Sequence, residues 1–415
     1  MPQQTPPLPL WAGRTVALLG IVLIALSIRS AVAAISPIVD EIGVDIELTS
    51  VGIGVIGMLP PVFFALSGFI APPIARRLGL EGALVLALIV MIAGHLVRAF
   101  SGSYAVLLIG SGLALVGMGI ANVLLPPAVK RYFPDRIGLL TATYATVMSI
   151  STAIPALLAA PLADSVGWRF SLGVWSALAV VALLPWITLL ARHRAAMSAA
   201  AREETPEVEQ ASPAAVTRLW RSPTAIAITI ALAVSAINAY ASFAWLPVIL
   251  IDITGVSPVA AGSLLALFSF AGLPASIIAP ILVARLRHSG ILVFAGVGFF
   301  VAGYLGLILA PTLAPWLWVL LIGLGPVLFP VSLVLINART RGHAGSVALS
   351  GFVQGIGYTI GAFGPLLVGV LHDVSGGWTL PLGFLLATAL VAIPAAIVLG
   401  RPRFVEDELA EHPRR

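Results

Sequence analysis

Twelve stretches of about 20 apolar residues follow one another along this 415-residue chain, and they constrain its fold more than any other feature. A helix rises about 1.5 Å per residue, so each stretch is long enough to cross a hydrocarbon core of about 30 Å. Hydrophobic residues make up 60% of the chain and charged residues only 9%, which is too little charge to cover a water-soluble globule. We therefore predict an all-α integral membrane protein with twelve transmembrane helices.

The order of the apolar stretches divides the chain into two halves. The spans are predicted at residues 15–36, 50–71, 82–100, 104–127, 138–161, 169–190, 223–246, 257–280, 290–310, 313–336, 345–370 and 379–400. Residues 191–222, between the sixth and seventh spans, form the only long polar stretch and are predicted to be a flexible cytoplasmic linker. The expected domains are six-helix bundles over residues 1–190 and 223–415, the second with a short cytoplasmic tail.

The basic residues predict the orientation in the membrane. Nineteen of the 22 Lys and Arg residues fall on the cytoplasmic side if both termini are cytoplasmic, and the exceptions are Arg29, Arg98 and Arg169. We expect a protein of the cell (inner) membrane in that orientation. The pairs Arg76-Arg77 and Lys130-Arg131 are interpreted as topology determinants, with contacts at an inner gate as the alternative. The first span contains Arg29 and is long for a signal peptide, so we expect it to be retained.

The composition also argues against several kinds of chemistry. The chain has no Cys, which excludes disulfides, thiol catalysis and Cys-based metal sites. It has no GxxxxGK[ST] motif for ATP and no metal-ligand cluster or nucleophile triad in its polar loops. We therefore expect neither an enzyme nor a metal or cofactor. The expected partners are a small-molecule substrate and the lipid bilayer, with no nucleic acid and with a monomer as the working form.

An internal repeat relates the two halves. Arg76 matches Arg285 and Asp164 matches Asp373 at an offset of 209 residues, and Trp168 matches Trp378 at 210. Two parallel repeats of six helices joined by a central linker are typical of the major facilitator transporters, in which the substrate site lies near the membrane midplane between the halves.

Three longer runs make the resemblance more specific. GMGIANVLLPPAVKRYFPDRIGLLTATY (117–144), NAYASFAWLPVIL (238–250) and LSGFVQGIGYTIGAFGPLLVGVLHDVSGGW (349–378) resemble the cyanate and 2-nitroimidazole transporter branch of that superfamily. The resemblance covers residues from about 14 to about 400. In that branch the first helix often ends in Arg-Pro, whereas this chain has Arg29-Ser30.

The resemblance implies a central cavity lined by polar residues of the repeat. Arg29 is equivalent to Asn238 at offset 209, and Tyr144 to Gln354 at offset 210. With Tyr240 and Tyr358 they are the predicted substrate-binding residues. His95 corresponds to Tyr304 on more peripheral helices, and His95 and Asn122 are secondary candidates.

Arg29 carries the functional hypothesis, because a charge inside a span is costly and usually faces a bundle interior or a water-filled path. No Asp or Glu lies within a predicted span to pair with it, which favours an anionic or strongly polar substrate that a guanidinium can bind bidentately. The alternatives are bonds from Arg29 to backbone carbonyls, hydrogen bonds between helices for Asn238 and Gln354, and packing for the tyrosines.

We therefore predict a secondary-active or facilitative transporter that moves a small anionic or strongly polar solute by alternating access. A broad-specificity drug efflux pump is the alternative, and a sensor or scaffold is disfavoured because the chain has no soluble domain. The coupling ion, the transport direction and the solute itself are left open.

Overall fold

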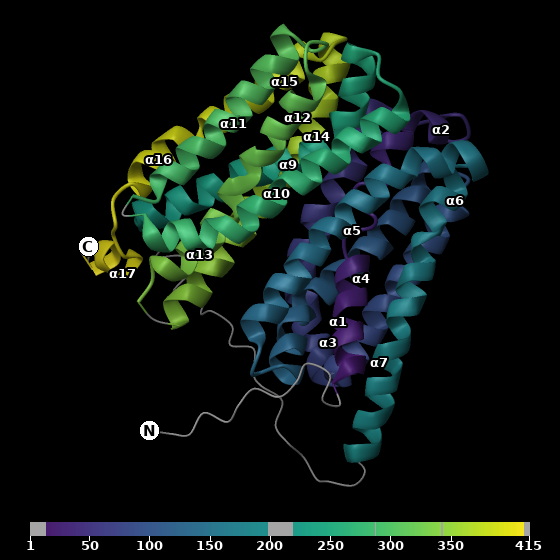
Figure 1. The fold of residues 1–415 in the computed structure, drawn as a ribbon, viewed down its shortest axis with the longest axis vertical. Helices are drawn as coiled ribbons and strands as arrows, with labels where there is room; N and C mark the ends of the chain where they lie inside the picture. The colour runs from purple at the N-terminus through teal and green to yellow at the C-terminus, as the bar shows by residue number, and fades with distance from the viewer. Residues whose placement is uncertain (1–13, 198–218, 287, 342, 411–415) are drawn as a thin grey trace. The chain divides into compact units, whose positions relative to one another are not determined.

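The computed structural model describes residues 14–197, 219–286, 288–341 and 343–410, and these residues form helices joined by short turns (Figure 1). Most of the predicted linker, residues 198–218, lies outside the described residues. Ten described helices are long and apolar enough to cross a membrane. One of them, α3 (Ser50–Ala99), is long enough for two spans, and the shorter apolar helix α1 (Thr15–Ser27) supplies another. The prediction of an all-α, twelve-span fold is confirmed.

The chain divides into two compact units that do not coincide with the two halves of the sequence. Unit 1 comprises Met1–Ala34 and Leu66–Glu207, and unit 2 comprises Ile35–Ala65 and Val208–Arg415. The predicted first domain, residues 1–190, thus contributes one internal segment to the unit formed by the second half. The chain enters unit 2 where α1 has ended and returns to unit 1 within α3.

Unit 1 contains six helices or parts of helices. They are α1, the second part of α3, α4 (Tyr104–Tyr132), α5 (Ile137–Val166), α6 (Trp168–Gly173) and α7 (Trp175–Met197). α1 and α7 lie side by side (Figure 1). Trp186 Nε1 of α7 donates a hydrogen bond to the Gly20 carbonyl at 3.1 Å, and a Cβ at Gly20 would lie 3.0 Å from that indole. The glycine therefore sets the close approach of the two helices.

Unit 2 contains the remaining elements. They are η1 (Ser36–Ile38), α2 (Val39–Gly43), the first part of α3, η2 (Leu219–Arg221), α9 (Pro223–Thr254), α10 (Pro258–Arg285), α11 (Gly290–Leu309), α12 (Pro315–Leu324), η3 (Gly325–Val327), α13 (Leu328–Ala338), α14 (His343–Ser375), α15 (Thr379–Leu390), α16 (Ala392–Leu399) and α17 (Val405–Ala410). A Cβ at Gly361 of α14 would lie 2.5 Å from Ala236 Cβ, and one at Gly364 would lie 2.8 Å from the Ile237 carbonyl oxygen. Small residues thus let α9 and α14 pack closely, as in other membrane bundles.

Local sequence explains where several helices begin and turn. Ser222 and Ser257 accept hydrogen bonds from the backbone N–H three residues later, and each is followed by proline at the first helical position. Gly79 has φ 72° and ψ 168° and makes the turn between the two spans of α3, a conformation that favours glycine.

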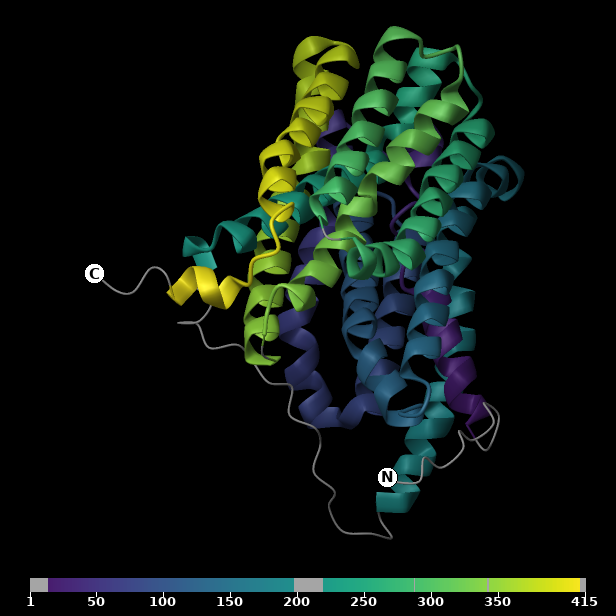
Figure 2. The ribbon, with the colours of Figure 1, turned by 60° about the vertical axis from the view of Figure 1, so that its left-hand side comes forward.

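The short helix α17 is tied to the start of α9 within unit 2 (Figure 2). The buried Glu408 carboxylate accepts hydrogen bonds from the Ser222 hydroxyl, from Thr224 Oγ1 at 2.7 Å and from Thr224 N at 3.1 Å. A carboxylate at this position satisfies free N–H groups and interacts favourably with the helix dipole.

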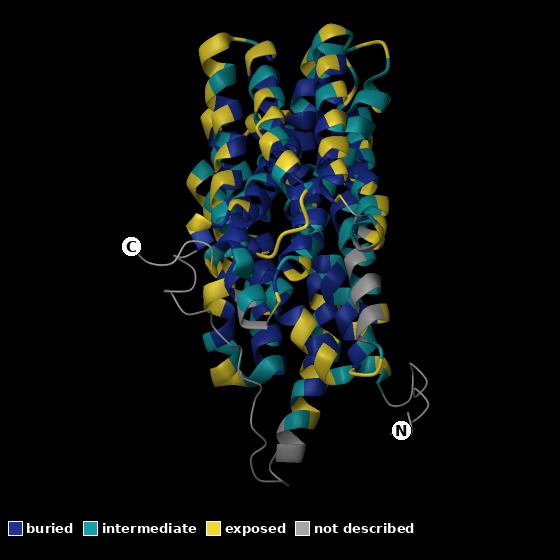
Figure 3. Ribbon diagram, turned by 90° about the vertical axis from the view of Figure 1, so that its left-hand side faces the viewer, coloured by how far each residue is buried: buried dark blue, intermediate teal, exposed yellow. Residues whose placement is uncertain are grey.

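The distribution of exposed side chains fits a lipid environment. Large apolar side chains such as Ile109, Leu184 and Ile397 are about 60% exposed on helices whose other faces are buried. Figure 3 shows buried and exposed positions alternating along individual helices. This pattern is expected where lipid rather than water surrounds the helices, and the chain is an integral membrane protein.

Candidate functional site

The first span is interrupted at the predicted binding residue Arg29. α1 ends at Ser27, and regular α-helix resumes only at Val39, after η1. Arg29 lies in this interruption and is half-buried, and its backbone N–H donates to Ser151 Oγ at 3.2 Å. The Ser151 hydroxyl in turn donates to the Leu26 carbonyl. One serine of α5 therefore satisfies two backbone groups released by the break, as irregular backbone at membrane depth requires.

Tyr144 lies on the same helix as Ser151. The two are seven residues apart, or about two helical turns, so they share a face of α5. Tyr144 is half-buried. Sequence reasoning did not select Ser151, because a serine in a span carries no signal that distinguishes a helix-packing residue from one that supports a break.

Three other predicted residues gather in unit 2. The rings of Tyr240 (α9) and Tyr358 (α14) meet edge to face with centroids 6.5 Å apart, and Phe329 of α13 lies 6.2 Å from Tyr358. Gln354, one helical turn before Tyr358, is half-buried and donates from Nε2 to Ser350 Oγ at 2.7 Å. The aromatic edges and the amide thus occupy neighbouring positions on one unit.

Asn238 has a different environment from its repeat partner Arg29. Its side chain is fully buried, Oδ1 accepts from Tyr304 Oη at 2.8 Å, and Nδ2 donates to the Val234 carbonyl and to Thr388 Oγ1 at 2.8 and 3.2 Å. These bonds join α9 to α11 and α15. A solute at Asn238 would have to compete with them.

The secondary candidates occupy different places in unit 1. His95 is fully buried on α3, with Nε2 3.3 Å from Ser30 Oγ, next to the break in the first span. Asn122 is half-buried on α4. The repeat relation between His95 and Tyr304 therefore appears in the structure as two side chains that each contact the opening span of their own repeat.

The predicted gating or topology residues lie near one end of unit 1. Arg76, Arg77, Lys130 and Arg131 are exposed. Arg131 Nε lies 3.3 Å from Glu81 Oε1, which also accepts a hydrogen bond from Tyr132 Oη, and Arg131 Nη2 lies 3.2 Å from His193 Nδ1. Glu81 is fully buried two residues after the turn at Gly79 and one residue before the start of the predicted third span. In the sequence, the only indication that Glu81 is buried was its position directly before an apolar run.

A second ion pair lies at the start of α1. Arg14 Nη1 is 2.6 Å from Asp135 Oδ1. The hydrogen bond to Asp135 raises the pKa of Arg14, and the same bond lowers the pKa of the Asp135 carboxyl below its ordinary value. Because the pair is solvent-exposed, it contributes little to stability.

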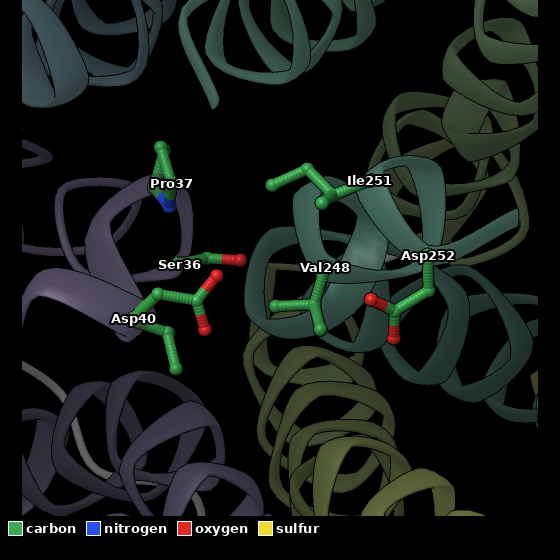
Figure 4. A pocket seen from close by; sticks show the side chains of 7 residues that line it. Ser36, Pro37, Asp40, Val248, Ile251 and Asp252 are labelled. Atoms are coloured by element: carbon green, nitrogen blue, oxygen red, sulfur yellow. The ribbon is translucent and has the colours of Figure 1, made fainter. Parts of the chain in front are cut away.

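A small polar pocket of unit 2 lies between the η1–α2 segment and α9 (Figure 4). Its volume of about 10 Å³ holds about one water molecule. Asp40 and Asp252 contribute carboxylates, and Ser36 Oγ donates to the Ala244 carbonyl at 2.6 Å. Close packing continues along α3, where a Cβ at Gly57 would lie 2.5 Å from Ala244 Cβ.

Residues 17–362 match the family model of the Major Facilitator Superfamily. The chain belongs to this superfamily. It is 34% identical to a 2-nitroimidazole transporter of Escherichia coli strain K12 over 391 residues, which cover 92% of this chain and 94% of the relative. It is 28% identical to the cyanate transport protein CynX of the same organism over 371 residues, which cover 88% and 92% of the two chains.

Solved structures support the same fold. A bacterial homologue of the human lysosomal transporter Spinster superposes with a TM-score of 0.75 at 16% identity, covering 97% of this chain and 98% of that one. A D-xylose–proton symporter gives a TM-score of 0.72 at 13% identity, covering 95% and 98%. The superfamily member described here is a membrane transporter of small molecules, not an enzyme, and the resemblance to the cyanate and nitroimidazole branch is confirmed.

Proposed function

We propose that this transporter moves a small anionic or strongly polar solute, of the cyanate or 2-nitroimidazole kind, by alternating access. The observation that carries the proposal is Arg29, a guanidinium placed where the first span loses its helical hydrogen bonds. Interrupted helices in transporters commonly supply the groups that bind the solute. The names of the two relatives support a solute of this chemical class.

Arg29 is assigned the principal contact with the solute. A guanidinium offers five donors in a planar fork, which suits a planar anion or a nitro group. Ser151 fixes the backbone of Arg29 from α5, so the charge is presented from a supported position. Tyr144 is assigned to the same side of the solute path.

Unit 2 is assigned the contacts that orient the solute. Tyr240, Tyr358 and Gln354 present ring edges, hydroxyls and an amide, which suit a planar aromatic or linear polar solute. Asn238 is assigned a positioning role for α9, because both polar atoms of its amide already have partners.

Alternating access requires that packed segments separate and pack again. The segment Ile35–Ala65 comes from the first repeat but packs in unit 2, where Gly54 and Gly57 allow contact with the backbone and side chain of Pro365. We assign this seam of small residues to the moving part of the transporter. We also propose that the protein lies in the inner membrane with both termini in the cytoplasm and that it works as a monomer.

The test is counterflow in proteoliposomes with labelled cyanate and 2-nitroimidazole. R29Q is expected to lower transport about 10- to 100-fold, the loss expected when a charge-assisted pair of hydrogen bonds is removed. R29K keeps the charge but not the fork and should fall between wild type and R29Q. R192Q removes an exposed arginine of unit 1 to which no role is assigned and serves as the matched control.

Unchanged counterflow by folded R29Q would contradict the role of Arg29. A lipophilic cation is included as a further solute, because the aromatic group of unit 2 also suits drug efflux. Transport of that cation, with no transport of cyanate or 2-nitroimidazole, would favour the efflux alternative.

A further inference from the structure

Arg98, at the end of α3 in unit 1, is a buried cation that the transport proposal does not use. Its side chain is fully buried, and Nε, Nη1 and Nη2 all lack a hydrogen-bond acceptor among the described residues. None of the ion pairs in the described parts of the chain involves it. A buried guanidinium without a partner is strongly destabilising, so an acceptor from outside the described residues is expected.

The surroundings of Arg98 are electropositive and reach the protein surface. The Ser101 hydroxyl donates to the Arg98 carbonyl at 2.8 Å, and Arg169 Nη2 lies 3.5 Å from the Ser101 carbonyl. Arg169 is exposed and lies over the Trp168 ring at 4.2 Å. Arg98 and Arg169 are also the two loop-end arginines that depart from the positive-inside distribution. Ser101 contacts both residues, which gives that departure a physical reason, since two cations in one region of unit 1 attract an anion from the surface.

The packing around Arg98 limits the size of such an anion. A Cβ at Gly110 would lie 2.8 Å from Arg98 N and 3.0 Å from its Cγ. A Cβ at Gly94, one turn earlier, would lie 2.2 Å from Ala114 N. α3 and α4 are therefore nearly in backbone contact beside the base of the Arg98 side chain, and the side chain itself is fully buried, which favours a small anion.

We propose that Arg98 binds a small inorganic anion of single charge, of the size of chloride, inside unit 1. The anion supplies the acceptor for the guanidinium, and the site is separate from the solute contact at Arg29. His95 lies one turn from Arg98, within electrostatic reach of it, and its bond to Ser30 connects the anion site to the interrupted first span.

The experiment is thermal unfolding of the purified full-length protein, followed by the fluorescence of its nine Trp residues. Chloride or bromide is titrated against gluconate at constant ionic strength. Wild type is expected to show a saturable rise in the unfolding midpoint of about 2–5 °C. R98Q should show no rise. R76Q, which changes an exposed arginine of the same helix, and R29Q should both keep the full rise.

Absence of a saturable rise in wild type would overturn the proposal, as would a full rise in folded R98Q. Loss of the rise in R29Q would also overturn it, because the anion would then be bound at the solute contact. Anomalous scattering from a wild-type crystal grown with bromide decides the matter if R98Q does not fold. A bromide peak beside the Arg98 guanidinium supports the site, and its absence there contradicts it.

Discussion

The two units contain equivalent polar positions that are satisfied in different ways. In unit 2, Asn238, Tyr304 and Thr388 form a closed network in which the amide of Asn238 bonds three partners. In unit 1, the corresponding helices carry Arg29, His95 and Arg98. His95 Nε2 lies 3.3 Å from Ser30 Oγ, and the Arg98 guanidinium has no acceptor in the described part of the chain. One unit closes its buried polar positions with internal hydrogen bonds, whereas the other buries a guanidinium, Arg98, that has no acceptor among the described residues.

The largest effect should come from breaking the closed network of unit 2. N238A removes three hydrogen bonds, leaves Tyr304 Oη buried without its acceptor and creates a small cavity, so we expect a loss of about 2–4 kcal/mol. The midpoint of thermal unfolding in detergent measures this. Y304F removes one bond and should cost about 1 kcal/mol. A stable N238A protein would mean that the network does not hold α9, α11 and α15 together.

A smaller effect, of opposite sign, is expected when the buried guanidinium of unit 1 is removed. R98M replaces the buried guanidinium by an apolar side chain of similar length, so stability in gluconate buffer should stay the same or rise by about 1–2 kcal/mol. The same unfolding measurement applies, with N238A measured in parallel. Destabilisation as large as that of N238A would show that Arg98 has protein acceptors and would remove the contrast between the units.

The contact between His95 and Ser30 should contribute less than any bond of the unit 2 network. It is long at 3.3 Å, and the Ser30 hydroxyl already donates to the Ser27 carbonyl at 2.9 Å. S30A should therefore change stability by at most about 0.5 kcal/mol. A double-mutant cycle of S30A with H95A measures the coupling. Coupling above about 1 kcal/mol would make this pair as strong as its counterpart in unit 2.

The smallest effect concerns the exposed pair of Arg14 and Asp135. The pKa of Asp135 is lowered in the folded protein, so the pair stabilises above the unfolded pKa and this contribution is lost as the pH falls through the folded pKa. The difference between wild type and D135N in the unfolding midpoint should be small near pH 6, disappear in strongly acidic buffer and shrink in 1 M salt. A difference in unfolding midpoint between wild type and D135N that grows on acidification would contradict a lowered pKa for Asp135 in the folded protein.

Much of the fold was predictable from sequence, because a bilayer requires each spanning segment to be apolar and to satisfy its own backbone. The repeat offset also identified the equivalences of Arg29 with Asn238 and of His95 with Tyr304. It could not indicate that the Asn238 amide turns to α11 and α15, because a side-chain direction depends on neighbours that hydropathy does not encode.

The break in the first span and the packing of residues 35–65 also could not be predicted from sequence, because each depends on residues far away in the chain. The break after Ser27 has no proline at its start to mark it, since the first proline after Ser27 is Pro37. Its support comes from a distant serine, Ser151. The packing of residues 35–65 in unit 2 depends on partners more than 170 positions away, such as Ala244 for Gly57. Apolar periodicity identifies a buried face and leaves its partner unspecified.

The attachment of Glu408 to Ser222 and Thr224 has a practical consequence for anyone who expresses this protein. The last described helix, α17, stabilises the start of α9, the seventh span, although its sequence resembles that of a polar C-terminal tail. A reporter fusion or truncation that removes Glu408 would leave the Thr224 backbone N–H and the hydroxyls of Ser222 and Thr224 without their acceptor. Shortened versions should therefore keep the chain through Ala410.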